Sequence, residues 1–530
     1  MNIAEHIERG AKFFPHKAAL IFEGKSFTYK QLNELVNRAA NGLQGLGVKR
    51  GDRVALFLPN IPEFVISYLG ILKIGAIAVS ISVMLKCDEV RLILNDCEAK
   101  VVITTASLSR QVPDAELAYL EHILIAESEA NKRSSLEEMM ANASPEARAI
   151  KMERHEPAAI LYTSGTTGFP KGATLSHGNV ISNIYAKNRC CKMQPEDRLL
   201  LYLPLFHCFG QNAILNSAFN ACATIVLQRR FVPAEILSAI ARERITMFFG
   251  VPTVFIKLLE LHPSECDFSS VRYYFSASAP MSAEIVQKWQ SLHNLVIHEG
   301  YGLTETSPFA CYNHELKYKL GSIGMPIENV EMQAIDRDGK EVAPGVVGEL
   351  VIRGPNVMLG YWNRPVETAQ VLKNGWFHTG DLGWMDDDGY FYIVDRLKDM
   401  INVSGFKVYP NEVERVLATH PAVAEVAVYG VPDPVKGEIV KANILLKSGQ
   451  LLVAEDAIAF CSERIAAYKV PHLIQFVDSL PKNATGKVLK RLLRESHTQP
   501  SQHQVQKVKT LPVFEAASLL QAPLLTSESS

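Results

Sequence analysis

The stretch YTSGTTGFPKG, residues 162–172, combines three glycines, four serine or threonine hydroxyls and one lysine. Its glycines let the backbone turn without a Cβ penalty and bring N–H groups close to an anion. The hydroxyls add neutral donors, and Lys171 adds a mobile positive charge. The stretch therefore predicts a loop that holds a polyphosphate.

The segments on either side of this loop read as extended chain. Apolar residues 158–161 precede it, and Ala-Thr-Leu-Ser-His (173–177) follows it, which predicts a strand, a glycine-rich turn and a second extended segment. The P-loop of ATPases differs, because it requires Ser or Thr directly after its lysine and then a helix, whereas Gly172 follows Lys171 here. A merely polar surface turn is the alternative, and a lysine held behind an aromatic residue and a proline argues against it.

Size and composition indicate a globular protein of several domains. The 530 residues exceed the ~250–300 at which single cores stop growing. A hydrophobic content of 48%, a charged content of 21% and a net charge of −2 give no support for a nucleic-acid surface. Nine cysteines show neither CxxC pairs nor zinc-type spacing, and the N-terminus MNIAEHIERG lacks the apolar core of a signal peptide. We therefore expect reduced thiols and a cytoplasmic location.

One apolar segment, residues 64–85, has about the length that a bilayer requires. Lys73 lies near its middle, and Gly70 and Gly75 interrupt it. The pattern predicts an amphipathic helix over 61–74 and a buried strand over 76–81, beside a mostly parallel sheet, rather than a transmembrane segment.

The predicted pattern of helices and strands changes twice along the chain. Up to about residue 320, apolar β-type runs alternate with helical patterns, which predicts a layered α/β assembly; these runs are 53–58, 100–104, 223–227, 246–250 and 271–276. From Gly321 onward, turn signals at 335–340 and 385–390 predict a β-rich subdomain with hairpins. After Asp395 a fresh α+β pattern follows, with helices expected at 410–417 and 455–464 and a strand at 423–430.

These changes predict the domain organisation. We expect a large α/β domain with a β-rich subdomain over residues 1–395, a hinge at 396–398 and a small, mobile α+β domain over 399–496. The Gln- and Ser-rich residues 497–530 are expected to be a disordered tail, and a docking or membrane-touching role for 511–520 stays open.

Four further motifs suit a nucleotide. EGYGLTET (299–306) offers Tyr301 to stack on a base and Glu305 to bind a divalent cation. FHTGDLG (377–383) places Asp381 in a turn, where it can accept ribose hydroxyls. The motifs DRLKDM (395–400) and PKNATGK (481–487) supply Arg396 and Lys487. Any one of these could be a solvated loop, but five in a fixed order are hard to obtain by chance.

Through these five motifs, residues 5–495 of the chain resemble the adenylate-forming superfamily of acyl-CoA synthetases, luciferases and nonribosomal adenylation domains. The stretches VIRGPNVMLGYWNRP and DGYFYIVDRLKDMINVSGFKVYPNEVE are most similar to fatty acyl-CoA synthetases. The resemblance implies a reaction in two halves, in which a carboxylate attacks the α-phosphate of ATP to give acyl-AMP and pyrophosphate, and a thiol then displaces AMP.

The resemblance also implies the roles of individual residues. It assigns the phosphates to Thr163, Ser164, Gly165, Thr167, Gly168 and Lys171, the Mg²⁺ to Thr166 and Glu305, the adenine and its surroundings to Ser278, Ala279, Pro280, Gly300, Tyr301, Gly302 and Thr304, and the ribose to Asp381 and Arg396. Lys487 would bridge the carboxylate and the α-phosphate in the transition state. His207 is expected to be an aromatic gate near the acyl and thiol channels, in preference to a general base.

The second half-reaction implies a domain movement. Similar proteins swing their small domain about the position of Lys398, which would withdraw Lys487 and bring Ser404, Gly405 and Lys407 toward CoA.

The acyl pocket is expected to be apolar and to take a monocarboxylic acid, fatty before aromatic. Its walls would be Phe209, Ile214, Phe249, Val251 and Phe309. No lysine or arginine is evidently placed to bind a second carboxylate. Two alternatives stay open: transfer of the acyl group to an acyl carrier protein in place of CoA, and an inactive binding or scaffold protein with this fold. Acyl chain length and oligomeric state are left open.

Overall fold

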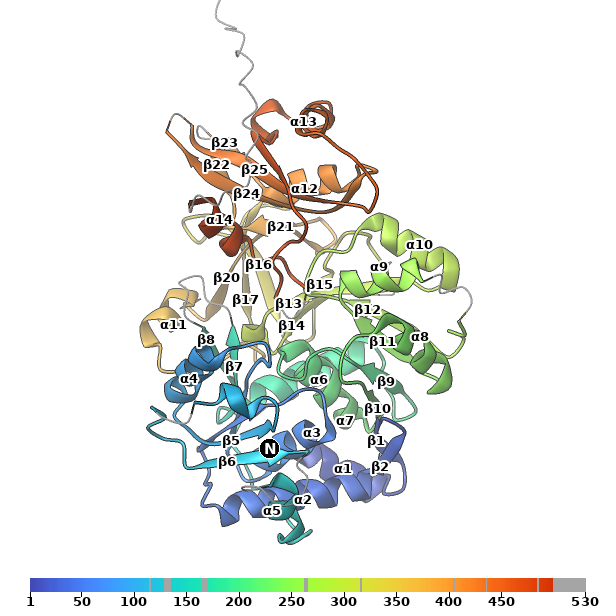
Figure 1. The fold of residues 1–530 in the computed structure, drawn as a ribbon, viewed down its shortest axis with the longest axis vertical. Coiled ribbons are helices and arrows are strands. Elements are labelled where there is room, and N and C mark those ends of the chain that lie inside the picture. Colours follow the sequence, from blue (N-terminus) through green and yellow to red (C-terminus); the bar gives the residue numbers. More distant parts are fainter. Residues whose placement is uncertain are drawn as a thin grey trace, which may run out of the picture. The chain divides into compact units, whose positions relative to one another are not determined.

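The computed structural model describes residues 1–113, 116–127, 135–163, 170–261, 266–314, 317–403, 406–434, 436–483 and 486–498. It divides into two units, each described here by itself (Figure 1). The large unit comprises Met1–Lys398 and Lys482–Lys487, and the small unit comprises Asp399–Pro481 and Val488–Ser530. The predicted tail from residue 499 onward lies outside the described residues.

A seven-stranded sheet in the large unit carries the predicted phosphate-loop strands. Its order is β18-β8-β7-β4-β3-β5-β6. Strands β7, β4, β3, β5 and β6 run parallel, and β8 pairs antiparallel with both β7 and β18. The strands are β3 (Arg53–Phe57), β4 (Ile77–Ser80), β5 (Ala99–Thr105), β6 (His122–Ala126), β7 (Pro157–Thr163), β8 (Lys171–Ser176) and β18 (Gly360–Tyr361). The predicted strand and second extended segment are therefore confirmed, while the turn between them, residues 164–169, lies outside the described part.

A nine-stranded sheet forms the second layer, in the order β15-β14-β13-β12-β11-β9-β10-β1-β2. Its central strands are parallel, so their carboxyl ends meet at one edge, where ligands bind in such sheets. The strands are β1 (Ala18–Phe22), β2 (Lys25–Thr28), β9 (Arg198–Leu201), β10 (Thr224–Leu227), β11 (Met247–Gly250), β12 (Tyr273–Ser276), β13 (Ile297–Gly302), β14 (Phe309–Tyr312) and β15 (Met325–Pro326).

Helices cover these sheets in the α/β pattern that the sequence predicts. They are α1 (Glu5–Phe13), α2 (Tyr29–Gly45), α3 (Pro62–Lys73), α4 (Cys87–Asp96), α5 (Leu136–Ala141), α6 (His177–Cys190), α7 (Ser217–Ala221), α8 (Pro233–Arg242), α9 (Pro252–Glu260), α10 (Ala283–His293) and α11 (Pro365–Val371). Short turns of helix include η1 (Ser109–Gln111), η2 (Phe209–Asn216) and η4 (Thr304–Thr306).

The apolar segment at 64–85 forms helix α3 and strand β4, as predicted. Every residue of α3 except Glu63 is buried, because α3 packs among other helices and against the sheet. Among the described residues, no helix combines the length and the apolar character needed to cross a membrane.

A five-stranded antiparallel sheet forms the predicted β-rich subdomain of the large unit. Its order is β16-β17-β20-β19, with β21 on β20. Strands β20 and β21 make the hairpin predicted at 385–390, and within it Asp381 pairs with Arg396. The strands are β16 (Glu331–Ile335), β17 (Gly348–Arg353), β19 (Leu372–Lys373), β20 (Trp376–Met385) and β21 (Phe391–Arg396).

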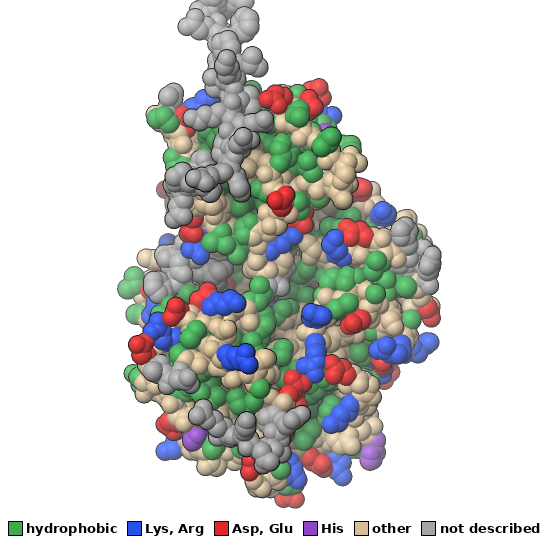
Figure 2. Space-filling view, viewed as in Figure 1, with side chains coloured by type: hydrophobic (Ala, Val, Ile, Leu, Met, Phe, Trp, Pro, Cys, Tyr) green, Lys and Arg blue, Asp and Glu red, His purple; other side chains and the backbone are tan. Residues whose placement is uncertain are grey.

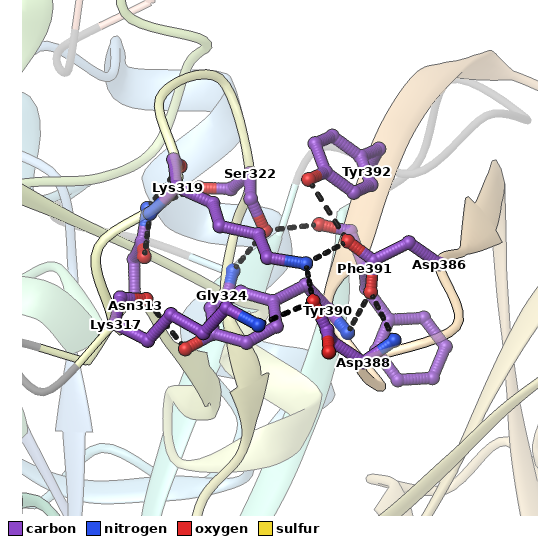
Figure 3. A network of polar contacts seen from close by, with 10 residues as sticks. All are labelled: Asn313, Lys317, Lys319, Ser322, Gly324, Asp386, Asp388, Tyr390, Phe391 and Tyr392. Atoms are coloured by element: carbon purple, nitrogen blue, oxygen red, sulfur yellow. Dashed lines mark hydrogen bonds and ion pairs between the residues drawn. The ribbon is translucent and has the colours of Figure 1, made fainter.

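A polar network fastens this hairpin to the segment that follows β14 (Figure 3). The Lys319 amino group lies between the carboxylates of Asp386 and Asp388 at the hairpin turn, and Lys317 Nζ lies 2.6 Å from Asp388 Oδ2. Lys317, and then Lys319, lower the pKa of the Asp388 carboxyl to about 2. Ser322 Oγ also donates a hydrogen bond to the backbone of β21 at 2.8 Å. The network ties the nine-stranded sheet to the hairpin that carries Asp381.

The small unit has its own sheet and core. The sheet order is β23-β22-β25-β24, with β26 on β25, and α12 packs on β24. Its elements are β22 (Ile401–Val403), β23 (Phe406–Val408), α12 (Pro410–Ala418), β24 (Val423–Asp433), β25 (Gly437–Leu446), α13 (Ala454–Ser462), η6 (Ala467–Lys469), β26 (Leu473–Phe476) and α14 (Lys490–Thr498). The α+β pattern expected after Asp395 is confirmed.

On the described part of the face in Figure 2, basic and acidic side chains are interspersed, as a net charge of −2 suggests. All nine cysteines lie in the described ranges and are free thiols.

Lys73 joins three helices inside the large unit. Its side chain is fully buried, and its Nζ lies 2.8 Å from Glu8 Oε1 on α1. The same group donates hydrogen bonds to Asn33 Oδ1 at 3.0 Å and Asn37 Oδ1 at 2.6 Å, both on α2. Burial lowers the pKa of Lys73, and the hydrogen bond to Glu8 opposes that shift.

We expect Lys73→Met to destabilise the large unit by about 3 kcal/mol, because it leaves a carboxylate and two amides without their shared donor. Urea unfolding followed by circular dichroism measures this loss. The double variant Lys73→Met with Glu8→Gln should recover part of it, because no charge is then left unpaired. Equal stability of Lys73→Met and the wild type would contradict the assignment.

Candidate active site

The described ends of the phosphate-loop region lie beside β18. Thr163 and Lys171 pair across β7 and β8, and Thr163 Oγ1 donates a hydrogen bond to the Lys171 carbonyl at 3.3 Å. Lys171 Nζ lies 5.4 Å from the centre of the Tyr361 ring, since β18 pairs with β8. The predicted phosphate and metal residues between them lie outside the described residues: Ser164, Gly165, Thr166, Thr167 and Gly168.

Glu305 lies at the hydroxyl of Tyr361. The Tyr361 hydroxyl donates a hydrogen bond to Glu305 Oε1 at 2.9 Å, and Glu305 is only 8% exposed. Its backbone carbonyl accepts a hydrogen bond from the Met358 amide at 2.8 Å. The structure thus brings two residues that are distant in sequence to one tyrosine, with Lys171 over its ring and Glu305 at its hydroxyl. Tyr361 had no role in the sequence analysis, although the stretch VIRGPNVMLGYWNRP contains it.

Two buried asparagines shape the turn that follows Glu305. Asn183 on α6 donates to the carbonyls of Thr306 and Phe309 at 3.3 and 2.7 Å. Asn356 donates to the same two carbonyls at 3.0 and 2.8 Å. Gly302 must be glycine here, because a Cβ would lie 1.7 Å from the Pro308 carbonyl oxygen. Sequence reasoning missed both asparagines, since each acts on backbone far along the chain.

The predicted ribose residues form one cluster. Asp381 is 4% exposed; its Oδ2 accepts a hydrogen bond from the Tyr301 hydroxyl at 2.5 Å, and its Oδ1 lies 2.5 Å from Arg396 Nε. Burial, and then Asp381, raise the pKa of Tyr301 well above its usual range, so the phenol stays a donor. Each carboxylate oxygen can accept more than one hydrogen bond, so Asp381 can still accept hydrogen bonds from the hydroxyls of a ribose.

The predicted adenine wall follows β12. Ser278, Ala279 and Pro280 are exposed, and Ser278 has a φ of 76°, in the left-handed region. On the adjacent strand, Gly300 lies against Phe275, where a Cβ would be 2.5 Å from the ring. This close packing lets the loop after β12 and residues 300–302, at the end of β13, lie side by side.

Glu299, next to Gly300, was not singled out in the sequence. It is 7% exposed, its Oε2 accepts a 3.4 Å hydrogen bond from the Met281 amide, and Oε1 has no partner among the described residues. Burial raises the pKa of Glu299 to about 7. Through Met281, Glu299 therefore contacts the segment that follows the predicted adenine wall. Thr304 begins the turn η4 that carries Glu305.

His207 lies in the connection between β9 and η2. Its Nδ1 accepts a hydrogen bond from the Phe209 amide at 3.2 Å, and burial lowers its pKa to about 4. The ring is therefore neutral at pH 7, with its proton on Nε2. Burial also raises the pKa of the adjacent Cys208 thiol far above its usual range, so the pair is no thiolate nucleophile. This chemistry suits the predicted gate better than a general base.

The remaining predicted residues lie near or beyond the unit boundary. Lys398 ends the first stretch of the large unit, and Lys487 ends the short stretch that groups with it. The Lys487 amide donates to Asn483 Oδ1 at 2.9 Å. Lys407 lies on β23 of the small unit, while Ser404 and Gly405 are outside the described residues. Their roles stay predictions.

The comparisons with known proteins cover nearly the whole chain. The AMP-binding enzyme family matches residues 7–362, and the AMP-binding enzyme C-terminal domain matches residues 412–487. A long-chain-fatty-acid–CoA ligase of Bacillus subtilis is 37% identical over 520 residues, covering 92% of this chain and 93% of that protein. A feruloyl-CoA synthase of an Amycolatopsis species is 36% identical over 490 residues, covering 92% of this chain and 97% of that protein.

A solved structure gives the same result. The crystal structure of the anthranilate CoA ligase AuaEII, in complex with anthranoyl-AMP, matches with a TM-score of 0.88 at 33% identity, covering 94% of this chain and 97% of that one. Family, relatives and fold agree with one another. The chain therefore belongs to the AMP-binding enzymes, the adenylate-forming family that its motifs resemble.

Proposed function

We propose that this protein is an AMP-forming acid–CoA ligase that activates an apolar carboxylic acid, a fatty acid in first place. The observation that carries the proposal is the alignment of Lys171, Tyr361 and Glu305, with Asp381 and Arg396 clustered on Tyr301. A cation, a buried carboxylate and a hydroxyl-accepting carboxylate are the groups that a metal-bound nucleoside triphosphate requires.

The first half-reaction would form the mixed anhydride. A carboxylate oxygen of the acid attacks the α-phosphorus, the bond to the bridging oxygen breaks, and pyrophosphate leaves. Charge builds on the α-phosphate oxygens, and Lys487 is the residue proposed to neutralise it. The Lys171 amino group would hold the outer phosphates through its charge. Its backbone carbonyl accepts the hydrogen bond from Thr163 that joins the two ends of the loop.

The donor set fits a magnesium ion. Glu305 and Thr166 would supply a carboxylate and a hydroxyl, which are oxygen ligands of the kind Mg²⁺ prefers. Bound there, the ion would neutralise charge on the phosphates. Tyr361 would orient the Glu305 carboxylate by its hydrogen bond, and Met358 would fix the backbone of the same residue.

In the second half-reaction the CoA sulfur attacks the acyl carbonyl carbon, the thiol proton goes to solvent, and AMP leaves with its phosphate oxygen. We propose that the small domain turns about Lys398 between the two steps, so that Ser404, Gly405 and Lys407 serve CoA. Transfer to an acyl carrier protein would use the same first half-reaction.

The substrate proposal rests on apolar walls. Phe275 lies 6.1, 5.8 and 5.2 Å, between ring centres, from Phe209, Phe249 and Phe309. All four rings are buried. Relatives named for fatty, feruloyl and anthranilate substrates support an acid with an apolar body. Free thiols suit a reducing compartment, so a cytoplasmic location is part of the proposal.

Pyrophosphate release with ATP, Mg²⁺ and a panel of fatty and aryl acids tests the proposal. We expect acid-dependent release that CoA accelerates, and a fall of about 100-fold or more for Lys487→Ala. Release that CoA leaves unchanged would favour a carrier-protein acceptor. No release with any acid would favour an inactive binding protein and refute the proposal.

The ribose cluster makes a separate prediction about nucleotide binding. Asp381→Asn should raise the dissociation constant of AMP about tenfold or more, because the ion pair with Arg396 is lost and one of the two acceptor oxygens becomes an NH2 donor. Tyr301→Phe is the matched control, since it keeps the ring and should weaken AMP by about threefold at most. Calorimetric titration measures both, and unchanged binding by Asp381→Asn would remove Asp381 from the site.

The hinge proposal predicts unequal losses in the two half-reactions. Lys398→Pro fixes φ near −65° and should slow thioester formation about tenfold more than acyl-AMP formation, because only the former needs the rearranged state. Lys398→Ala keeps the backbone free and serves as the control. Rapid-quench measurement of acyl-AMP and acyl-CoA gives both rates, and equal losses would exclude a hinge at Lys398.

A further inference from the structure

A small cavity lies behind the aromatic walls of the proposed acyl pocket. It offers about 10 Å³ to the centre of a water molecule, which is room for about one water or one oxygen of a ligand. Four aromatic residues line it, together with Cys190, Cys191, Ile327 and the side chain of Lys187 on α6; the aromatic residues are Tyr273, Phe275, Phe309 and Tyr312. A cavity lined by four aromatic rings is an unusual place for an amino group, because charge is costly there.

The Lys187 amino group has no hydrogen-bond partner in the described part of the chain. The residue is 4% exposed, and Nζ lies 4.5 Å from the centre of the Phe249 ring. Burial lowers the pKa of Lys187, while the nearby Cys191 thiol opposes that shift. Lys73, the other buried lysine described above, differs in that a carboxylate and two amides surround its amino group. A buried donor without a partner requires a ligand or water, or it destabilises the fold.

The cavity borders the walls of the proposed acyl pocket. Phe309, one of the walls that the sequence predicts for the acid, lines the cavity, and Phe249, another, lies against its lysine. Phe275 also lines the cavity, and it packs against Gly300, next to Tyr301 of the nucleotide cluster. Carboxylate chemistry would take place near Gly300, so an acid that extends along these walls would bring its far end toward Lys187.

We propose that Lys187 is a specificity-determining residue whose amino group donates a hydrogen bond to an oxygen at the end of the acid remote from its carboxylate. This inference rests on the proposed function and narrows its substrate class. The preferred acid would have an apolar or aromatic body and one distal hydroxyl or carbonyl oxygen, since the cavity admits about one such atom. Sequence patterns alone do not single out Lys187, because it lies on helix α6, outside the segments expected to line the pocket.

Two matched pairs of acids test the proposal: cinnamic with para-hydroxycinnamic acid, and dodecanoic with ω-hydroxydodecanoic acid. The wild type should favour the hydroxylated member of at least one pair by about tenfold or more in kcat/KM, because a site built around a polar donor rejects an analogue that leaves it unpaired. Pyrophosphate release in the presence of CoA measures all four acids.

Lys187→Met keeps the side-chain length and removes the donor. It should abolish the preference while the unhydroxylated acid keeps its kcat/KM within about threefold. Its melting temperature should equal or exceed that of the wild type, because an unpaired buried amine is removed. Lys187→Gln retains an N–H donor and should keep part of the preference for the hydroxylated acid. If Lys187→Met does not fold, Lys187→Gln takes its place in the test. Lys25→Met, at an exposed position on β2, is the matched control and should leave both pairs unchanged.

Two outcomes overturn the inference. One is a wild type that is indifferent to the hydroxyl in both pairs. The other is a Lys187→Met variant that lowers kcat/KM equally for both members of a pair, which would indicate a structural role filled by buried water. Failure of every acid to release pyrophosphate would instead refute the proposed function itself. Activity without discrimination at Lys187 refutes only the specificity role.

Discussion

The hydrogen bond from Tyr361 to Glu305 unites the large unit, because its partners come from different sheets. Tyr361 ends the edge strand of the seven-stranded sheet, and Glu305 follows β13 of the nine-stranded sheet. The bond is 2.9 Å long, and Glu305 is buried. A buried carboxylate without a partner is costly, so this contact helps to fix how the two sheets meet. The pairing of β18 with β8 then brings Lys171 over the same ring.

The five-stranded sheet contacts the nine-stranded sheet through a similar tyrosine–carboxylate hydrogen bond. Asp381, on β20, receives the Tyr301 hydroxyl from the nine-stranded sheet and pairs with Arg396 on the neighbouring strand. Both carboxylates of the site are therefore oriented by a tyrosine before any ligand arrives. Preorganised groups of this kind need little rearrangement when charge develops nearby, which is how adenylation would benefit from the architecture. The site is thus a meeting point of three sheets and depends on each of them.

Local pattern predicted most of the fold and part of the site. The helix and strand within residues 64–85, the hairpin that carries Asp381 and the strands around the phosphate loop all follow from periodicity and turn signals. Asn183, Tyr361 and Lys187 could not be found in this way, because each acts on a partner or cavity brought close only by the tertiary fold. A lysine on a helix usually reaches solvent, so sequence alone favours exposure for Lys187.

The ion pairs at the β20–β21 turn affect how the stability of the turn depends on pH. Lys317 and Lys319 hold the pKa of Asp388 at about 2, below the value of about 3.9 expected in the unfolded chain. A depressed carboxyl pKa adds stability that is complete above the unfolded value and is lost only as the pH falls through the folded one. The turn is exposed, so solvent screening keeps this contribution small. The contact of Asp388 with Lys317 and Lys319 should therefore persist through mild acidification, and its small contribution to holding the turn should be lost only as the pH falls from about 4 toward 2.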